Sequence, residues 1–387
     1  MKRKCFSVLL LLALPALSAG CAHAAASTPT NSSPWREEDV TLAFGPDALY
    51  GVLTLPPGEG PHPAIVIVSG SVNPSTGARS GVSSRYHIDH AREMVLHGFA
   101  VLRYDPPGVG RSTGQRGVES LDSRTAEAMA ALRSLQARPD IQPNRIGLWA
   151  DSQGVWVIGK AAAGFPEDVA FLIGVSGSAV SVAEQQVYSI EAQSAAAGFA
   201  EEDIAKAGLF GRLLIDWQLT HPIYRQANEA AAQKLGGGPW DDFMALVYEP
   251  GDITPAESLL QGIEILKSIQ DEPWTRFLYL RQLYIPQLES IPPEQAAALR
   301  GVMEPSLLED PKAYWTRVRC PVLAFFGEDD LLQPTAKSAA LYEQYLTEAG
   351  NQDFEIVVIP GVGHSIQLSM PTYGQTLADW LDQLYGE

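Results

Sequence analysis

The stretch Arg145-Ile-Gly-Leu-Trp-Ala-Asp-Ser152-Gln-Gly154 decides how this chain folds. Ile146 to Trp149 are an apolar run typical of a short buried strand, and Val155 to Ala163 are an apolar run typical of a helix. Ser152 therefore falls on the turn between a strand and a helix. A sharp turn of this kind, a nucleophile elbow, exposes a serine hydroxyl above the end of a sheet, next to backbone N–H groups.

Two further predicted strands end in residues that a serine nucleophile needs. Val322 to Phe326 leads into Gly327-Glu-Asp-Asp330, and Phe354 to Ile359 leads into Pro360-Gly-Val-Gly-His364. Serine, aspartate and histidine thus follow one another in the chain order of the α/β-hydrolase triad, each just past the carboxyl end of a strand.

With these motifs in this order, the chain resembles the α/β-hydrolase superfamily over about Val40 to Ala179 and from Arg319 to its end. The resemblance implies an α/β fold with a mostly parallel central sheet flanked by helices. The chain is similar to bacterial secreted or lipoprotein esterases, and to acylaminoacyl-peptidase-like and bile-acid-CoA-thioesterase-like catalytic domains. The elbow departs slightly from G-x-S-x-G, because Ala150 replaces the first glycine and Val155 stands where many relatives have another glycine.

The resemblance assigns the catalytic roles residue by residue. Ser152 is the expected nucleophile, His364 the base, and Asp330 the acid that orients the base. Relatives commonly have Gly-x-x-Asp with a proline four residues later, a spacing that favours Asp330, although Asp329 remains the alternative. Asp151 is not expected to be an aspartate nucleophile of the haloalkane dehalogenase type, because the residues flanking it at positions 149 and 153 are not small.

The apolar strand Ala64 to Val68 ends at Ser69-Gly-Ser71, where the superfamily places its oxyanion loop. We expect the backbone N–H groups of Ser71 and Gln153 to face an oxyanion, with Gly70 allowing the backbone to turn. A plain glycine turn explains Gly70 equally well.

Regular alternation of strands and helices stops after the predicted strand Val169 to Val175. From Val180 to Trp315 the sequence predicts helices interrupted by prolines, and the resemblance implies a large helical cap over the active site. Five aromatic residues either line a substrate pocket beneath this cap or form its own core: Trp217, Trp240, Trp274, Tyr279 and Tyr284.

The N-terminus has the three-part form of a secretory signal, with Met1-Lys-Arg-Lys4 followed by the apolar run Phe6 to Leu17. Leu17-Ser-Ala-Gly-Cys21 resembles a bacterial lipoprotein box, which predicts lipidation at Cys21 and a membrane tether. Cleavage after Ala24 or Ala26 by an ordinary signal peptidase is the alternative, giving a secreted protein. Either outcome places the protein outside the cytoplasm, in the bacterial periplasm or anchored to a membrane.

The sequence therefore divides into a signal peptide (1–21), a flexible tether (22–37), a hydrolase core (38–179 and 316–387) and the cap insertion (180–315).

Composition excludes several classes of function. With 27 Lys and Arg against 45 Asp and Glu, the net charge of −18 argues against a nucleic-acid partner. Cys320 is the one cysteine expected to remain unmodified after processing, so a disulfide framework is excluded, and its expected role is that of a small buried residue. The sequence supports neither a zinc site nor a cofactor.

The expected reaction is hydrolysis of a carboxylic ester of a small molecule by Ser152 through an acyl-enzyme. A serine peptidase or amidase and a thioesterase are alternatives on the same fold. Acyl-CoA is a cytoplasmic substrate, which counts against a thioesterase in an exported protein. Related peptidases usually carry an N-terminal propeller, for which we expect no room ahead of Val40. A catalytically silent binding protein is the alternative from another class. The oligomeric state is open.

Overall fold

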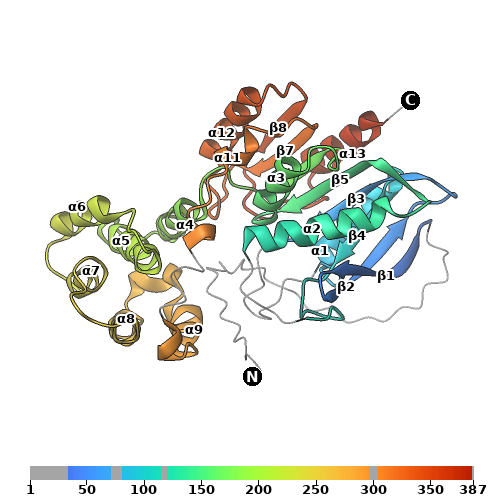
Figure 1. The fold of residues 1–387 in the computed structure, drawn as a ribbon. Helices are drawn as coiled ribbons and strands as arrows, with labels where there is room; N and C mark the ends of the chain where they lie inside the picture. The colour runs from blue at the N-terminus through green and yellow to red at the C-terminus, as the bar shows by residue number, and fades with distance from the viewer. Residues whose placement is uncertain (1–33, 71–80, 115–119, 297–303, 386–387) are drawn as a thin grey trace, which may run out of the picture.

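A computed structural model describes residues 34–70, 81–114, 120–296 and 304–385 (Figure 1). The predicted signal peptide with Cys21, most of the predicted tether, and Ser71 lie outside the described residues. Among the residues that are described, no helix combines the length and apolar character needed to cross a bilayer.

The described residues form one sheet of eight strands in the order β1-β2-β4-β3-β5-β6-β7-β8. The β1–β2 and β2–β4 pairs are antiparallel, and all the other pairs are parallel. The predicted mostly parallel sheet is thereby confirmed. The strands are β1 (Arg36–Phe44), β2 (Asp47–Leu55), β3 (His62–Val68), β4 (Ala100–Tyr104), β5 (Ile141–Asp151), β6 (Leu172–Val175), β7 (Val322–Gly327) and β8 (Phe354–Ile359).

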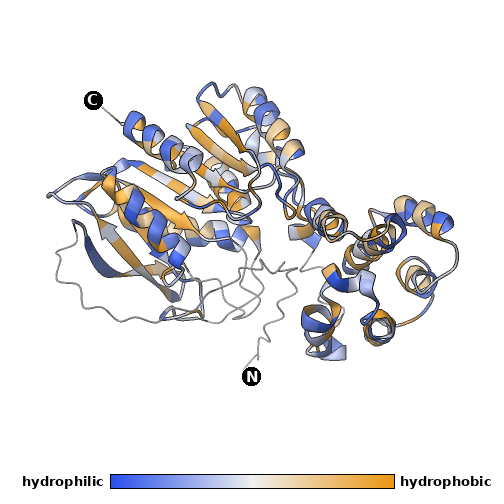
Figure 2. Cartoon of the chain, turned by 180° about the vertical axis from the view of Figure 1, so that it is seen from behind, coloured by the Kyte–Doolittle hydropathy of each residue, from blue (hydrophilic) through white to orange (hydrophobic). Residues whose placement is uncertain are grey.

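Apolar side chains alternate across the sheet and fill a core on each face. In β3, Ala64, Val66 and Val68 belong to one core, and Ile65 and Ile67 belong to the other. This double coverage explains why the central strands are continuous apolar runs in the sequence. In Figure 2 these strands are orange and lie between helices that turn blue residues outward.

Helices of the hydrolase core cover both faces of the sheet. The first core is closed by α2 (Leu121–Gln136), α3 (Gly154–Gly164), α11 (Lys312–Trp315) and α12 (Thr335–Glu348). The second core is closed by α1 (Arg85–Leu96) and α13 (Pro371–Leu384).

Between β6 and β7 every element in the described part of the chain is helical, and Figure 1 shows α5 to α9 beside the sheet, joined to it through α4. This is the segment predicted to be a cap, and that role stays a prediction. Its elements ahead of α11 are α4 (Val182–Ala196), α5 (Glu201–Gln218), α6 (Arg225–Leu235), α7 (Trp240–Tyr248), α8 (Pro255–Ile269), η1 (Pro273–Leu278), η2 (Leu280–Tyr284), α9 (Ile285–Glu289) and η3 (Pro293–Gln295).

Five aromatic residues of this helical region were predicted either to line a substrate pocket or to form the region's own core, and in the structure they lie mainly in the core. Trp217 donates from Nε1 to Ser258 Oγ at 3.1 Å, and the Trp274 ring lies 5.2 Å from that of Phe210. Both contacts join helices of the region to one another, which favours the core role over pocket lining. Trp217, Trp240, Trp274 and Tyr284 are buried, and Tyr279 is partly buried.

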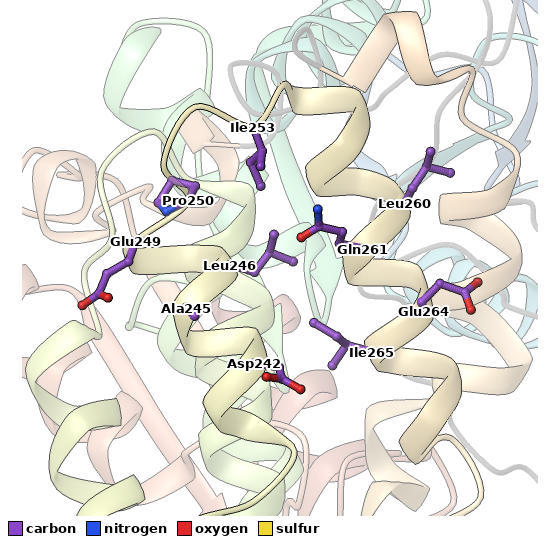
Figure 3. A pocket seen from close by; sticks show the side chains of 10 residues that line it. All are labelled: Asp242, Ala245, Leu246, Glu249, Pro250, Ile253, Leu260, Gln261, Glu264 and Ile265. Atoms are coloured by element: carbon purple, nitrogen blue, oxygen red, sulfur yellow. The ribbon is translucent and has the colours of Figure 1, made fainter.

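An open groove lies between α7 and α8, away from the strand ends (Figure 3). Leu246 and Ile265 point into the space between the two helices, and Asp242, Glu249 and Glu264 are among the other residues that line it. None of the residues predicted for catalysis lines this groove.

His90 of α1 contacts β5 and α13 in the second core, on the face of the sheet that α1 and α13 cover. Its Nδ1 lies 2.7 Å from the Tyr86 carbonyl oxygen, its Nε2 lies 2.9 Å from the Tyr373 hydroxyl, and its ring lies 4.7 Å from Trp149. Because a carbonyl only accepts, Nδ1 carries the proton of the neutral ring and Nε2 accepts from Tyr373. Burial, which disfavours the charged ring, lowers the pKa of His90 from 6.5 to about 4.

This buried neutral histidine predicts a pH-dependent stability. Between pH 6.5 and about 4 the unfolded chain binds a proton at His90 that the folded protein does not, so the free energy of unfolding falls as the pH falls through this window. The full effect is on the order of 3 kcal/mol. Urea unfolding at several pH values should show that His90→Gln lacks this part of the pH dependence. His221→Gln, which changes an exposed histidine, should keep it. A wild-type advantage over His90→Gln that is independent of pH would contradict the prediction.

Candidate active site

Ser152 lies on the turn between β5, which ends at Asp151, and α3, which begins at Gly154. Its φ of 49° is in the left-handed region, which is costly for a residue with a side chain. Its N–H donates to the Val175 carbonyl of β6 at 2.8 Å, and its own carbonyl accepts from the Val155 N–H at 3.0 Å. The predicted strand, turn and helix are therefore present, with the serine in the strained position of an elbow.

Two glycines allow the backbone to approach this turn closely. A Cβ at Gly154 would lie 2.5 Å from the Val68 carbonyl oxygen, and a Cβ at Gly70 would lie 2.7 Å from Asp151 Oδ2 and 3.2 Å from Ser152 Cβ. Gly70 is not in the left-handed region, so space, rather than the backbone freedom expected from the sequence, requires a glycine there.

The unusual Val155 is accommodated from the opposite side of the turn. A Cβ at Gly177 would lie 2.6 Å from the Val155 side chain, and a Cβ at Gly174 would lie 3.1 Å from it. The side chain of Val155 therefore fits because Gly174, in β6, and Gly177, after β6, have no side chains there.

The structure brings Ser152, His364 and Asp330 together in one hydrogen-bonded chain. His364 Nε2 lies 3.1 Å from Ser152 Oγ, and His364 Nδ1 lies 2.8 Å from Asp330 Oδ2. Since an ionised carboxylate only accepts, Nδ1 carries the proton, and in the neutral ring Nε2 is left to accept from the serine hydroxyl. This is the geometry that a serine nucleophile and its base require.

Asp330 is the acid that reaches the histidine, and Asp329 is exposed. The second carboxylate oxygen of Asp330 accepts from the N–H groups of Leu332 at 2.7 Å and Gln333 at 3.0 Å. Its carbonyl accepts from the Tyr188 hydroxyl of α4 at 2.9 Å. Asp330 is 2% exposed, so these contacts fix a buried carboxylate that faces His364.

The charges around His364 favour its protonated form. Burial alone would lower the pKa of His364, but the charge of Asp330 and its hydrogen bond, together with the charge of Asp151, raise the pKa above the ordinary value. A base with this bias is suited to hold a proton taken from Ser152.

Asp151 and His87 form a pair next to the turn that the sequence did not predict. Asp151 Oδ1 lies 2.9 Å from His87 Nε2 and accepts from the Gly70 N–H at 3.0 Å. Burial would raise the pKa of Asp151, but His87 and the Gly70 N–H hold it below the ordinary value. Ile88 of α1 is only partly buried, and His87 and His90 are buried.

Arg124 of α2 also lies next to the turn, and the sequence did not predict its role. It is 1% exposed and donates from Nη1 to Gln153 Oε1 at 2.6 Å and from Nη2 to the Gly70 carbonyl at 3.0 Å. It also donates to the Ser69 carbonyl. One signal was available in the sequence, because Arg124 lies at helical spacing from Leu121 and Ala128 on the inward stripe of the helix.

Ser176, directly after β6, supports the histidine loop. It has a left-handed φ of 52°, and its hydroxyl donates to the His364 carbonyl at 2.8 Å. Its N–H donates to the Phe325 carbonyl of β7 at 2.8 Å. Nothing local in the sequence marks this residue, because its partner is 188 positions away.

Of the two predicted oxyanion donors, Gln153 directly follows Ser152 at the start of α3. Ser71 lies outside the described residues.

Away from this site, burial raises the pKa of the Cys320 thiol to about 12, which agrees with a structural role.

Comparisons with known proteins point to one family. A model described as the alpha/beta hydrolase family matches residues 65–373. An esterase structure from Pyrococcus furiosus is 12% identical with a TM-score of 0.52, and the match covers 93% of this chain and 96% of that one. Proline iminopeptidase from Mycobacterium smegmatis is 18% identical with a TM-score of 0.50, covering 90% and 98%. At these identities the two structures show a shared fold alone.

A third structure, Est1E from Butyrivibrio proteoclasticus with ferulic acid bound, is 13% identical with a TM-score of 0.48, covering 90% of this chain and 100% of that one. No curated protein matches the chain.

The close approach at the turn predicts the effect of a single methyl group. Gly154→Ala should lower the free energy of unfolding by about 1–3 kcal/mol, because the added Cβ meets the backbone of β3. Gly164→Ala, at the other end of α3 with open space around it, should be neutral or slightly stabilising. Denaturant unfolding of both variants measures the difference, and equal effects at the two positions would show that the turn is not tightly packed.

Proposed function

Because the chain belongs to the alpha/beta hydrolase family, we propose that it is a serine hydrolase that cleaves carboxylic esters through an acyl-enzyme on Ser152. The observation that carries the proposal is the hydrogen-bonded chain from Ser152 Oγ through His364 to Asp330. A serine hydroxyl is a weak nucleophile unless a base lies within reach and is itself oriented by a third group.

In the proposed acylation step, Ser152 Oγ attacks the carbonyl carbon of the ester while His364 Nε2 takes the hydroxyl proton. Asp330 keeps the other ring nitrogen protonated and stabilises the imidazolium. The carbonyl oxygen becomes an oxyanion, for which the N–H groups of Ser71 and Gln153 are the proposed donors. The intermediate then collapses, and the alcohol leaves with the proton from His364.

In the proposed deacylation step, His364 takes a proton from a water molecule, and the hydroxide formed attacks the acyl carbon. Ser152 leaves with the proton and the carboxylic acid is released, so the enzyme returns to its starting state. His364 Nε2 lies 3.1 Å from Ser152 Oγ, and this nitrogen carries the proton in both proposed steps, so one base serves for the whole reaction.

The ester is proposed over the amide because its alcohol leaves a tetrahedral intermediate more readily than an amine, which has to be protonated first. Both an esterase and an iminopeptidase share this fold, so the fold itself favours neither substrate. A silent binding protein would have no need of a buried carboxylate that is held toward a histidine and a serine.

Labelling with a fluorophosphonate probe tests the serine mechanism. Wild-type protein should be labelled, and Ser152→Ala should lose the label and about 10⁴–10⁶-fold of its esterase turnover. Ser176→Ala, which changes another serine close to His364, should retain labelling at Ser152. Well-folded wild-type protein that does not react with the probe would instead favour the silent binding protein.

A paired assay tests the substrate class. Short-chain 4-nitrophenyl esters should be hydrolysed with a higher kcat/KM than aminoacyl 4-nitroanilides, and acyl-CoA thioesters should be poor substrates. A clear preference for the anilides would replace the esterase proposal by a peptidase or amidase.

A further inference from the structure

The peptide that joins Ser69 to Gly70 is held at both of its polar ends. Its carbonyl accepts from Arg124 Nη2, and its N–H donates to Asp151 Oδ1 at 3.0 Å. In a planar trans peptide the C=O and N–H groups point in opposite directions. Arg124 and Asp151 therefore grip one peptide plane from its two sides, and the plane cannot rotate without breaking a charged hydrogen bond.

Arg124 also connects this segment to the turn that carries Ser152. The same guanidinium donates to the Gly70 carbonyl at 3.0 Å and to Gln153 Oε1 at 2.6 Å. A guanidinium is a rigid planar group whose donors keep fixed directions. The end of β3 and the residue after the serine are thus set relative to each other by one buried side chain.

Asp151, which binds the N–H end of this peptide, is itself held in place by its neighbours. His87 of α1 lies 2.9 Å from its carboxylate, and the close packing of Gly70 against Asp151 and Ser152 leaves no room for the segment to shift inward. Arg124 of α2 thus binds the Ser69–Gly70 segment directly, and His87 of α1 holds Asp151, which binds the same segment.

From this geometry we infer that Arg124 and Asp151 are positioning residues that hold the Ser69–Gly70 segment against the nucleophile turn, so that Gly70 and Gln153 are fixed beside Ser152, with the Gln153 N–H set for the oxyanion, before substrate arrives. The inference rests on the proposed serine-hydrolase function. A purely structural alternative is that both side chains only satisfy the backbone groups at the end of β3. The two roles differ in effect, because an oxyanion exists only after the hydroxyl has attacked, so the positioning role affects kcat and leaves KM unchanged.

Arg124→Met tests the arginine side of the clamp. With 4-nitrophenyl esters kcat should fall about 10²–10³-fold, the range seen when one oxyanion donor is lost, at an unchanged KM. The affinity for a trifluoromethyl ketone, whose adduct with serine carries an oxyanion, should fall by a similar factor. The affinity for the product carboxylic acid should not change. Arg133→Met, on the exposed side of the same helix, is the matched control and should behave as wild type.

Arg124→Lys separates charge from geometry. A lysine keeps the positive charge but cannot grip two carbonyls and an amide with a planar fork, so its kcat should stay well below wild type. Full activity in Arg124→Lys, or an equal loss of ketone and product affinity in Arg124→Met, would overturn the positioning role of the arginine.

Asp151 provides an independent test if Arg124→Met does not fold. Asp151→Asn keeps an oxygen that can accept from the Gly70 N–H, whereas Asp151→Ala removes it, so kcat should fall much further in Asp151→Ala than in Asp151→Asn. Asp89→Asn on α1 is the control. Equal kcat values for Asp151→Asn and Asp151→Ala would overturn the inference for the aspartate.

The failure of this inference is distinguishable from the failure of the proposed function. If wild-type protein neither reacts with a fluorophosphonate nor cleaves esters, the proposed function is wrong and the inference falls with it. If wild-type protein does both and the Arg124 and Asp151 variants match it in kcat, the inference alone is wrong. Folded fractions are measured for every variant by thermal unfolding, so that a loss of folded protein is not counted as a loss of kcat.

Discussion

The structure around the site depends on one strained backbone position, the left-handed turn at Ser152. A left-handed conformation costs a residue with a side chain roughly 1–2 kcal/mol, so it persists only where the neighbours impose it. Here the Ser152 N–H is bonded to β6, and Gly154 lies directly under the last carbonyl of β3. Both strands that flank β5 therefore have to be in place before the hydroxyl can project from the end of the sheet.

Much of what surrounds the turn adjusts to it. Val155 takes space that Gly174 and Gly177 leave empty, so a departure from the family pattern on α3 is matched by small residues at the end of β6. Ser176, the second strained residue at this edge, binds the carbonyl of His364. The loops after β6, β7 and β8 are linked in this way, which explains how residues from distant parts of the sequence keep hydrogen-bond distances to one another.

The sequence predicted the features that have a local or periodic signal. Ala64 to Val68 and Val322 to Phe326 are apolar on both faces because helices cover both sides of the sheet, and this makes such strands easy to predict. The order of Ser152, Asp330 and His364 likewise came from motifs at strand ends.

The roles of His87, Arg124 and Ser176 depend instead on partners far away in the chain. Hydrophobic character alone also did not decide whether the aromatic residues of the helical region line a pocket or fill a core. Arg124 is the exception that the sequence could have flagged, since a lone cation on a buried stripe needs a buried partner.

The carboxylate of Asp151 beside Ser152 has two opposing effects on the proposed reaction. Attack by the serine creates an oxyanion and an imidazolium at the same time, and the carboxylate of Asp151 destabilises the first and stabilises the second. The charge and hydrogen bond of Asp330 raise the pKa of His364 most, and the charge of Asp151 adds to their effect. The carboxylate of Asp151 is hydrogen-bonded by His87 and by the Gly70 N–H, and Arg124 places a positive charge at the carbonyl of the same peptide. An aspartate next to the nucleophile is therefore compatible with acyl transfer because its charge is partnered, and the partners are the same groups that hold the peptide in place.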